Sequence, residues 1–157
     1  MKSKLSLSEF RIRLKTNTEI GSLKVKLSTF RLFPKFGGTK PFYGLFDDNS
    51  FRLTLNSELS STIFVLKGKY KVVGNVLKLD YVVEPNSKLQ SIWMEYFPIV
   101  LIVAINLFFL FFGKGLRRAS TIVNLFLLFI TFYSRWKENR KKKKLEKKFI
   151  RIFEITE

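Results

Sequence analysis

Residues 97 to 113 read FPIVLIVAINLFFLFFG, seventeen uncharged residues in succession. A helix of about 20 residues crosses the hydrocarbon core of a bilayer, with a usual range of about 17 to 25. The alternative is a buried helix of a soluble bundle, but such a helix carries a polar face that recurs every 3.6 residues. Between Ile99 and Phe112 only Asn106 is polar. The stretch therefore predicts a transmembrane helix.

A second uncharged run, ASTIVNLFLLFITFYS, follows at residues 119 to 134 after GKGLRR at 113 to 118. The two glycines and three cations between the runs are typical of a turn. We predict a two-helix transmembrane hairpin, at about 92 to 113 and 119 to 134. The aromatic residues expected at one membrane interface are Trp93, Tyr96, Tyr133 and Trp136. Because the second run is short, a re-entrant hairpin that enters and leaves on one side is the alternative.

Residues 135 to 148, RWKENRKKKKLEKK, carry nine cations and two acids directly after the second run. Basic residues beside a membrane segment stay on the cytoplasmic side. Two crossings return the chain to the side that it left, so both termini are expected in the cytoplasm, with the protein in the inner (plasma) membrane. The three turn cations, Lys114, Arg117 and Arg118, oppose this orientation and are outnumbered.

The first ninety residues show the alternation of strands. Apolar and cationic residues alternate at 10 to 15 and again at 23 to 27, and further strands are predicted at 51 to 55, 63 to 73 and 76 to 83. Gly74 and Asn75 favour a tight primed turn between the last two. The expected fold class is membrane α+β, a small antiparallel β-barrel or sandwich joined to the hairpin.

Residues 149 to 156, FIRIFEIT, are also β-prone. A strand here would lie on the same side of the membrane as the β-domain and would cover a free sheet edge. The predicted organisation is a basic β-domain at 1 to 90, the hairpin at 91 to 134, a basic juxtamembrane segment at 135 to 148, and a returning C-terminal strand at 149 to 157.

The chain of 157 residues contains no cysteine and no histidine, and its formal net charge is +17. These absences remove thiolate nucleophiles, the commonest general base and the commonest metal ligands. We therefore predict a protein that is not an enzyme and that has no metal or cofactor. Asp47 and Asp48, the only adjacent acidic pair, are interpreted as a type I turn rather than a divalent-ion site.

Two groups of residues are candidates for anion binding. In the glycine-rich segment 37 to 44, Lys40 and backbone amides could hold a phosphate while Phe42 or Tyr43 stacks on a base, although a plain connection between strands is the favoured interpretation. The second group would share one face of two adjacent strands and consists of Arg11, Arg13, Lys15, Lys24 and Lys26. Each cation contributes about 1 kcal/mol at an anionic leaflet. A solvated polar face is equally expected, and nucleic acid is a less favoured partner than lipid.

Asn106 and Asn124 are the conspicuous polar residues of the two apolar runs. An amide in hydrocarbon is costly unless it is hydrogen-bonded. The partner is either the other helix of the hairpin or a neighbouring protomer, and a polar ring around a pore is a third possibility. We predict self-association of the hairpins through the faces that carry these two residues.

The span from Gly44 through Phe51-Arg52-Leu53 to Gly68-Lys69-Tyr70, followed by two apolar runs, resembles small bacterial membrane proteins with a cytoplasmic β-domain. In architecture the chain is similar to antiphage membrane effectors in which a minimal β-barrel senses a cyclic oligonucleotide and a transmembrane hairpin breaches the inner membrane. Those effectors place the hairpin before the barrel, whereas here the order is reversed, so no residue roles are carried over.

The expected function is a binding or sensor module in which the β-domain recognises an anionic small molecule, lipid or protein partner. The hairpin would anchor it in the bilayer and assemble it as a homo-oligomer or as a subunit of a membrane complex. The alternative is a pore-forming effector of a bacterial defence system, gated by a nucleotide-like ligand.

Overall fold

The computed structural model describes residues 1–23, 38–56, 64–113, 115 and 117–156. The chain forms two compact units. Met1–Ser87 together with Lys141–Glu157 make up the first, here called the β-domain, and Lys88–Arg140 make up the second, the helical hairpin. The β-domain is thus built from both ends of the sequence.

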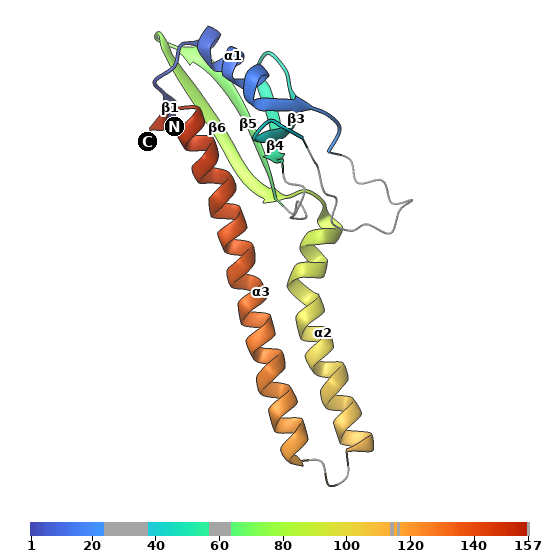
Figure 1. The fold of residues 1–157 in the computed structure, drawn as a ribbon. Coiled ribbons are helices and arrows are strands. Elements are labelled where there is room, and N and C mark those ends of the chain that lie inside the picture. Colours follow the sequence, from blue (N-terminus) through green and yellow to red (C-terminus); the bar gives the residue numbers. More distant parts are fainter. Residues whose placement is uncertain (24–37, 57–63, 114, 116, 157) are drawn as a thin grey trace. The chain divides into compact units, whose positions relative to one another are not determined.

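The β-domain contains a mixed seven-stranded sheet with the order β2-β3-β4-β5-β6-β1-β7 (Figure 1). Its strands are β1 (Lys2–Ser3), β2 (Thr18–Ile20), β3 (Phe42–Phe46), β4 (Ser50–Leu55), β5 (Phe64–Val73), β6 (Val76–Pro85) and β7 (Ile155–Thr156). The β2–β3 pair is parallel and the other pairs are antiparallel. The expected small antiparallel barrel or sandwich is therefore only partly right, because the sheet is mixed and does not close into a barrel. It ends on strands of three and two residues, and helices cover its core face.

The β5–β6 hairpin confirms the prediction made from its turn. Gly74 and Asn75 have φ angles of 57° and 60°, the left-handed values that a type I′ turn requires at both central positions. Val73 therefore pairs with Val76, and the register continues to Phe64 opposite Pro85. This hairpin contributes the two longest strands of the sheet.

A helix, α1 (Leu7–Asn17), occupies the segment 10 to 15 that alternation predicted as a strand. Ser6 and Glu9 form a capping box, in which the Ser6 amide donates to Glu9 Oε2 at 2.9 Å and the Glu9 amide donates to Ser6 Oγ at 3.3 Å. Phe10 and Leu14, one turn apart, are buried in the core. Of the second predicted strand, 23 to 27, only Leu23 is among the described residues, and it belongs to no helix or strand. Residues 24 to 27 lie outside the described residues.

The C-terminal segment is helical where a strand was expected. Helix α3 (Arg117–Ile152) includes residues 149 to 152, and only Ile155–Thr156 forms a strand, which pairs with β1. A helix forms here rather than a strand because Leu145, Phe149 and Phe153 recur every four residues and place one apolar face on the sheet. The chain does return to the β-domain, but chiefly through this helical face.

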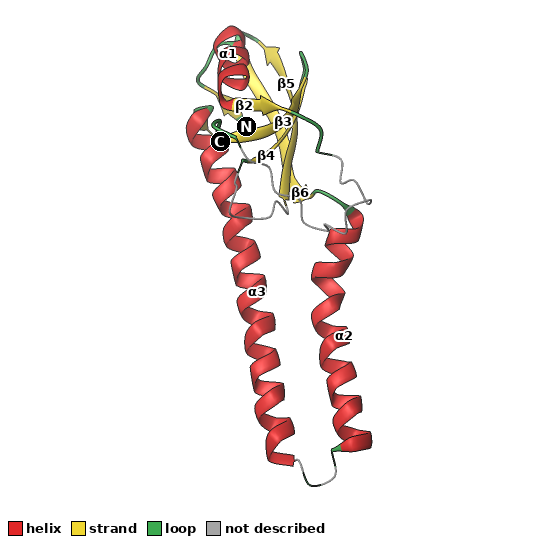
Figure 2. Ribbon diagram, turned by 45° about the vertical axis from the view of Figure 1, so that its right-hand side comes forward, coloured by secondary structure: helices red, strands yellow, loops and turns green. Residues whose placement is uncertain are grey.

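Figure 2 shows α1 and the end of α3 beside the sheet. Aromatic side chains fill the core between the sheet and these two helices. Phe10 of α1 lies 4.9 Å, between ring centroids, from Tyr70 of β5 and from Phe153, which follows α3. Phe51 of β4 lies over Gly68, where a Cβ would clash with its ring. Helix α1 and the end of α3 therefore cover the same face of the sheet.

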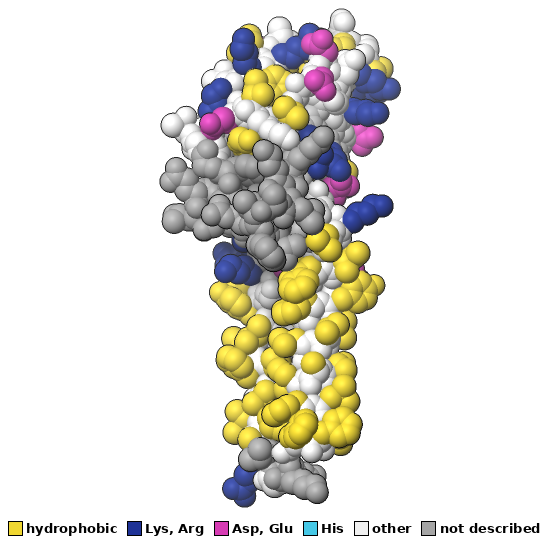
Figure 3. Space-filling model, turned by 90° about the vertical axis from the view of Figure 1, so that its right-hand side faces the viewer, with side chains coloured by type: hydrophobic (Ala, Val, Ile, Leu, Met, Phe, Trp, Pro, Cys, Tyr) yellow, Lys and Arg dark blue, Asp and Glu magenta, His cyan; other side chains and the backbone are white. Residues whose placement is uncertain are grey.

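The helical hairpin consists of α2 (Lys88–Phe112) and the first part of α3. Both helices are long and apolar enough to cross a membrane. Most of their apolar side chains are exposed, with Leu110 at 73% and Phe132 at 76%. Figure 3 shows these hydrophobic side chains covering the hairpin surface.

Candidate functional site

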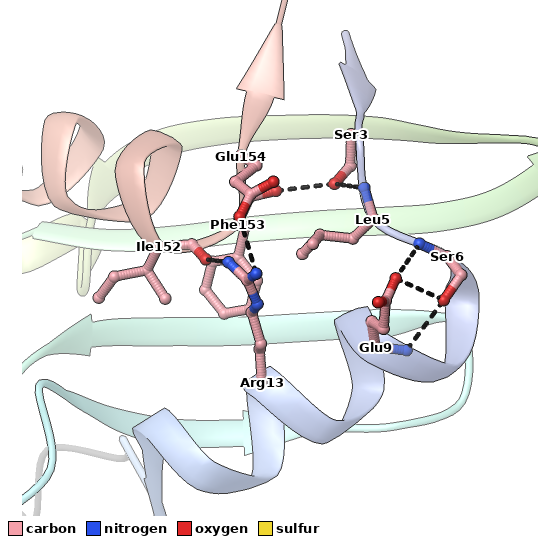
Figure 4. Close-up of polar contacts among 8 residues, drawn as sticks. All are labelled: Ser3, Leu5, Ser6, Glu9, Arg13, Ile152, Phe153 and Glu154. Atoms are coloured by element: carbon pink, nitrogen blue, oxygen red, sulfur yellow. Dashed lines mark hydrogen bonds and ion pairs between the residues drawn. The ribbon is translucent and has the colours of Figure 1, made fainter.

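Arg13, a predicted anion-binding residue, holds the end of α3 in place instead (Figure 4). Its Nη1 donates to the Ile152 carbonyl oxygen at 2.7 Å, and its Nη2 lies 2.7 Å from Glu154 Oε1. Ser3 Oγ donates to the neighbouring Phe153 carbonyl at 2.7 Å. The last carbonyls of a helix lack intrahelical donors and carry partial negative charge, so a cation there stabilises the helix end. Arg13 is therefore a helix cap.

The other predicted cations of this region also have local partners. Arg11 contacts Asp48, with 3.2 Å to the carboxylate and 2.9 Å to the main-chain oxygen. Lys40 donates from Nζ to the carbonyls of Lys15 at 2.9 Å and Thr18 at 3.2 Å, at the end of α1. The expected shared face of Arg11, Arg13 and Lys15 on adjacent strands does not exist, because all three lie on α1. Lys24 and Lys26 lie outside the described residues.

The two aromatic candidates do not form a stacking platform. Phe42 is fully buried, with its ring centroid 6.1 Å from that of Phe153. Tyr43 points to the opposite face of β3 and covers Gly21, where a Cβ would clash with its hydroxyl. Phe42 therefore cannot stack on a bound base, the role that the sequence left open but did not favour, because its side chain is part of the core.

The face of the sheet opposite the core presents a basic surface that our sequence reasoning missed. Strand alternation places six cations there, Lys2, Arg52, Lys67, Lys69, Lys71 and Lys78, with Asp80 and Glu84 as the acids on β6. The signal was present in the sequence. A two-residue turn at Gly74-Asn75 fixes the register of β5 against β6, and hence which lysines face each other.

The cations of this basic surface differ in how they are compensated. Lys67 forms an ion pair with Glu84, and Lys69 lies directly opposite Asp80. Lys71, Lys78 and Lys2 instead lie directly opposite one another on β5, β6 and β1. Within the described part of the chain, no ion pair involves these last three. We call them the lysine row.

The β-domain end of α3 is a second basic region. Lys148 is half-buried, and its burial lowers the pKa of its ammonium group, with the neighbouring Lys144 and Arg151 acting in the same direction. No carboxylate contributes to that shift. Conversely, burial raises the pKa of the Tyr70 hydroxyl, which donates to the Asp47 carbonyl at 2.7 Å.

Asp47 and Asp48 belong to the turn between β3 and β4, as expected. The Asp47 amide donates to the Ser50 carbonyl at 2.8 Å, and Ser50 Oγ lies 3.4 Å from Asp47 Oδ2. Among the described residues, no group of three or more acidic, histidine or cysteine side chains is arranged to hold a metal ion. The hydrogen bonds of Asp47 and Ser50 are those of a turn between two strands.

Asn106 and Asn124 bond to each other within the hairpin. Asn106 Nδ2 donates to Asn124 Oδ1 at 2.8 Å, and Asn124 Nδ2 donates to Asn106 Oδ1 at 3.0 Å. Asn106 also donates to the Ile102 carbonyl, one turn earlier on α2. This is the pairing that the sequence left open as one of three possibilities, and it satisfies both amides without a second protomer.

Comparison with known proteins gives no further assignment. No protein-family model matches the chain, and neither a curated protein nor a solved structure matches it.

Proposed function

We propose that the chain is a non-enzymatic, membrane-anchored binding module, with the hairpin in the bilayer and the β-domain at its cytoplasmic surface. One observation carries this proposal. Helix α3 contains, without interruption, the uncharged run 119 to 134, the cationic run 135 to 148 and the core residue Phe149 of the β-domain. A helix that is apolar, then cationic, then buried in a domain is suited to cross an anionic interface.

The exposed side chains of the hairpin support its placement in lipid. Phe111, Phe112, Phe129 and Phe132 are each more than 60% exposed. Monomeric soluble proteins rarely expose contiguous apolar patches beyond a few hundred Å². In a bilayer the same surface faces hydrocarbon, and the reciprocal Asn106–Asn124 bonds give the two amides hydrogen-bond partners there.

The cationic run supports the orientation. Nine cations follow the second apolar run, and such residues are retained on the cytoplasmic side. Under this proposal the protein is a two-pass inner-membrane protein with both ends of the chain in the cytoplasm. Trp136 would lie at the interface, where Arg140 packs 4.7 Å above its ring centroid.

Protease protection tests the topology. Added to intact spheroplasts, protease should leave the β-domain whole, and after lysis it should cleave within the domain. Carbonate extraction of the membranes should leave the protein in the pellet. Removal of the β-domain from the outside would reverse the orientation, and release into the carbonate supernatant would exclude the transmembrane hairpin.

The pore-forming effector remains the second candidate and makes a different prediction. The hydrogen-bonded asparagine pair disfavours it, since pore-lining amides would have to break these bonds. Liposomes containing the purified chain should show no ion conductance if the hairpin serves as an anchor. Conductance that appears with an added nucleotide would favour the effector.

A further inference from the structure

The lysine row is an arrangement of like charges that the fold itself does not need. Lys71, Lys78 and Lys2 are direct cross-strand neighbours on β5, β6 and β1. Adjacent strands are about 4.8 Å apart, so the three side chains start within about 10 Å of one another. Like charges directly opposite each other destabilise a sheet. All three residues are exposed.

The rows on either side of the lysine row show that this arrangement is local. On one side Lys69 lies opposite Asp80, an opposite-charge pair of the kind that stabilises sheets. On the other side Val73 lies opposite Val76, next to the Gly74-Asn75 turn. The uncompensated charge is therefore one residue deep along the strands and three strands wide.

A site one residue long and three strands wide favours a compact anion over an extended one. A long polyanion such as a nucleic-acid strand or an acidic peptide, laid along the strands, would run onto Asp80 on one side and onto valines on the other. Lysine ammonium groups on flexible stems can converge on one compact group, and they bind phosphate as point charges. The strand residues that flank the row on β5 and β6 are Lys69, Val73, Val76 and Asp80. None of these four is aromatic, so none can stack on a base.

We propose that the lysine row is a binding site for a compact polyanion with clustered phosphate groups. The group belongs either to a free phosphorylated small molecule or to a phosphorylated lipid headgroup. This inference deepens the proposed function, because it names the ligand class of the β-domain, and it rests on that domain being a binding module.

The test uses the full chain in phosphatidylcholine nanodiscs, titrated calorimetrically with sodium tripolyphosphate and with inositol hexakisphosphate. Lys78 is the central residue of the row, so Lys78→Gln should weaken binding by about tenfold or more, which corresponds to the loss of one charge-assisted contact. Lys78→Arg should retain binding. Lys69→Gln is the matched control, with the same charge removed from the same face. It should change the affinity by less than about twofold, because Lys69 lies directly opposite the acidic Asp80 and outside the lysine row.

Two further measurements separate the sources and the alternatives. Binding to nanodiscs that contain a polyphosphorylated inositol lipid, in competition with free inositol hexakisphosphate, identifies whether the headgroup or the free molecule binds more tightly. The inference is overturned if neither phosphate probe binds, if Lys78→Gln weakens binding no more than Lys69→Gln, or if polyglutamate or single-stranded DNA binds the row more tightly than tripolyphosphate.

Carbonate extraction of the same variants keeps this inference separate from the proposed function. Loss of phosphate binding with the chain still in the membrane pellet overturns only the ligand class. Release of the wild-type chain from the membrane overturns the anchoring, whatever the phosphate titration shows.

Discussion

The two units of this protein distribute polarity in opposite ways. In the β-domain, Phe10, Phe149 and Phe153 are completely buried and the cations lie outside. In the hairpin, phenylalanines lie on the outside and the asparagine pair is hydrogen-bonded between the helices. The β-domain thus buries its aromatic side chains, whereas the hairpin exposes them and pairs its two amides with each other. This difference supports the proposed anchoring, in which the two parts of α3 would lie in different surroundings, one in lipid and one in water.

Phe149→Ala should have the largest effect on the β-domain. Truncation of a buried phenylalanine costs about 3 to 5 kcal/mol through lost burial and a residual cavity. Phe132→Ala, on the hairpin and 76% exposed, is the matched control and should leave the domain unchanged. Both tryptophans, Trp93 and Trp136, belong to the hairpin, so amide hydrogen exchange of β5 and β6 is the suitable measurement. Equal exchange in the two variants would show that the end of α3 is not part of the core.

Truncation after Lys148 is a coarser version of this change, because it removes both Phe149 and Phe153. The domain should then lose protection throughout the sheet. If the truncated chain melts at the temperature of the full chain, the segment does not belong to the fold.

Arg13→Met should have the next largest effect. The variant keeps the apolar stem of the side chain but removes the contacts to Ile152 and Glu154. Because both partners of the ion pair are more than one-third exposed, we expect a loss of only about 1 kcal/mol. Hydrogen exchange should increase first in the last turn of α3. Arg11→Met, which removes an exposed ion pair with Asp48, should cost less.

Asn106→Leu tests the hairpin side of the comparison. The single variant leaves the Asn124 amide without its partner, and hydrogen bonds of this type average about 0.6 kcal/mol in membranes. The double variant Asn106→Leu, Asn124→Leu removes both amides and should be more stable than the single one. Since the two residues satisfy each other, the double variant should also keep the particle mass of the wild type in detergent. A smaller particle would restore the prediction that these faces join protomers.

Glu9→Gln should have the smallest effect, visible as a change in pH dependence. Hydrogen bonds from Ser6 lower the pKa of the Glu9 carboxyl below its ordinary value of 4.5. A group with a lowered folded-state pKa contributes stability above its unfolded pKa and loses it as the pH falls through the folded pKa. The acid-side decline of stability should therefore be shallower in Glu9→Gln than in the wild type. Identical pH profiles would show that the capping carboxylate does not contribute.

The sequence predicted the elements whose signal is local. Uncharged length identified the two apolar helices, and Gly74-Asn75 identified the β5–β6 hairpin. The alternating pattern at 10 to 15 predicted a strand, but a helix forms there. The capping box of Ser6 and Glu9 was the sequence signal for that helix. The strand prediction failed again at 149 to 152, because the helix that begins at Arg117 continues through the segment and buries every fourth residue.

The candidate site could be predicted less well than the fold. Arg13 and Lys40 are cations by type, but their function depends on carbonyls at helix ends, one of which is 139 residues away in the sequence. Part of the lysine row could be predicted from the sequence, since the turn fixes Lys71 opposite Lys78. Lys2 could not be placed, because its pairing depends on β1 joining β6 across most of the chain.

The contact between Ser3 and Phe153 joins residues 150 positions apart, and both apolar helices lie between them in the sequence. During synthesis, the first ninety residues leave the ribosome while Phe149 and Phe153 do not yet exist. Until the hairpin has been made, the rings of Phe10, Phe42 and Phe51 therefore lack the Phe149 and Phe153 rings that they contact in the folded domain. The β-domain core can be completed only after both apolar segments have been translated. A chain that stalls before residue 149 leaves this core incomplete, and chaperones or proteases can then recognise it.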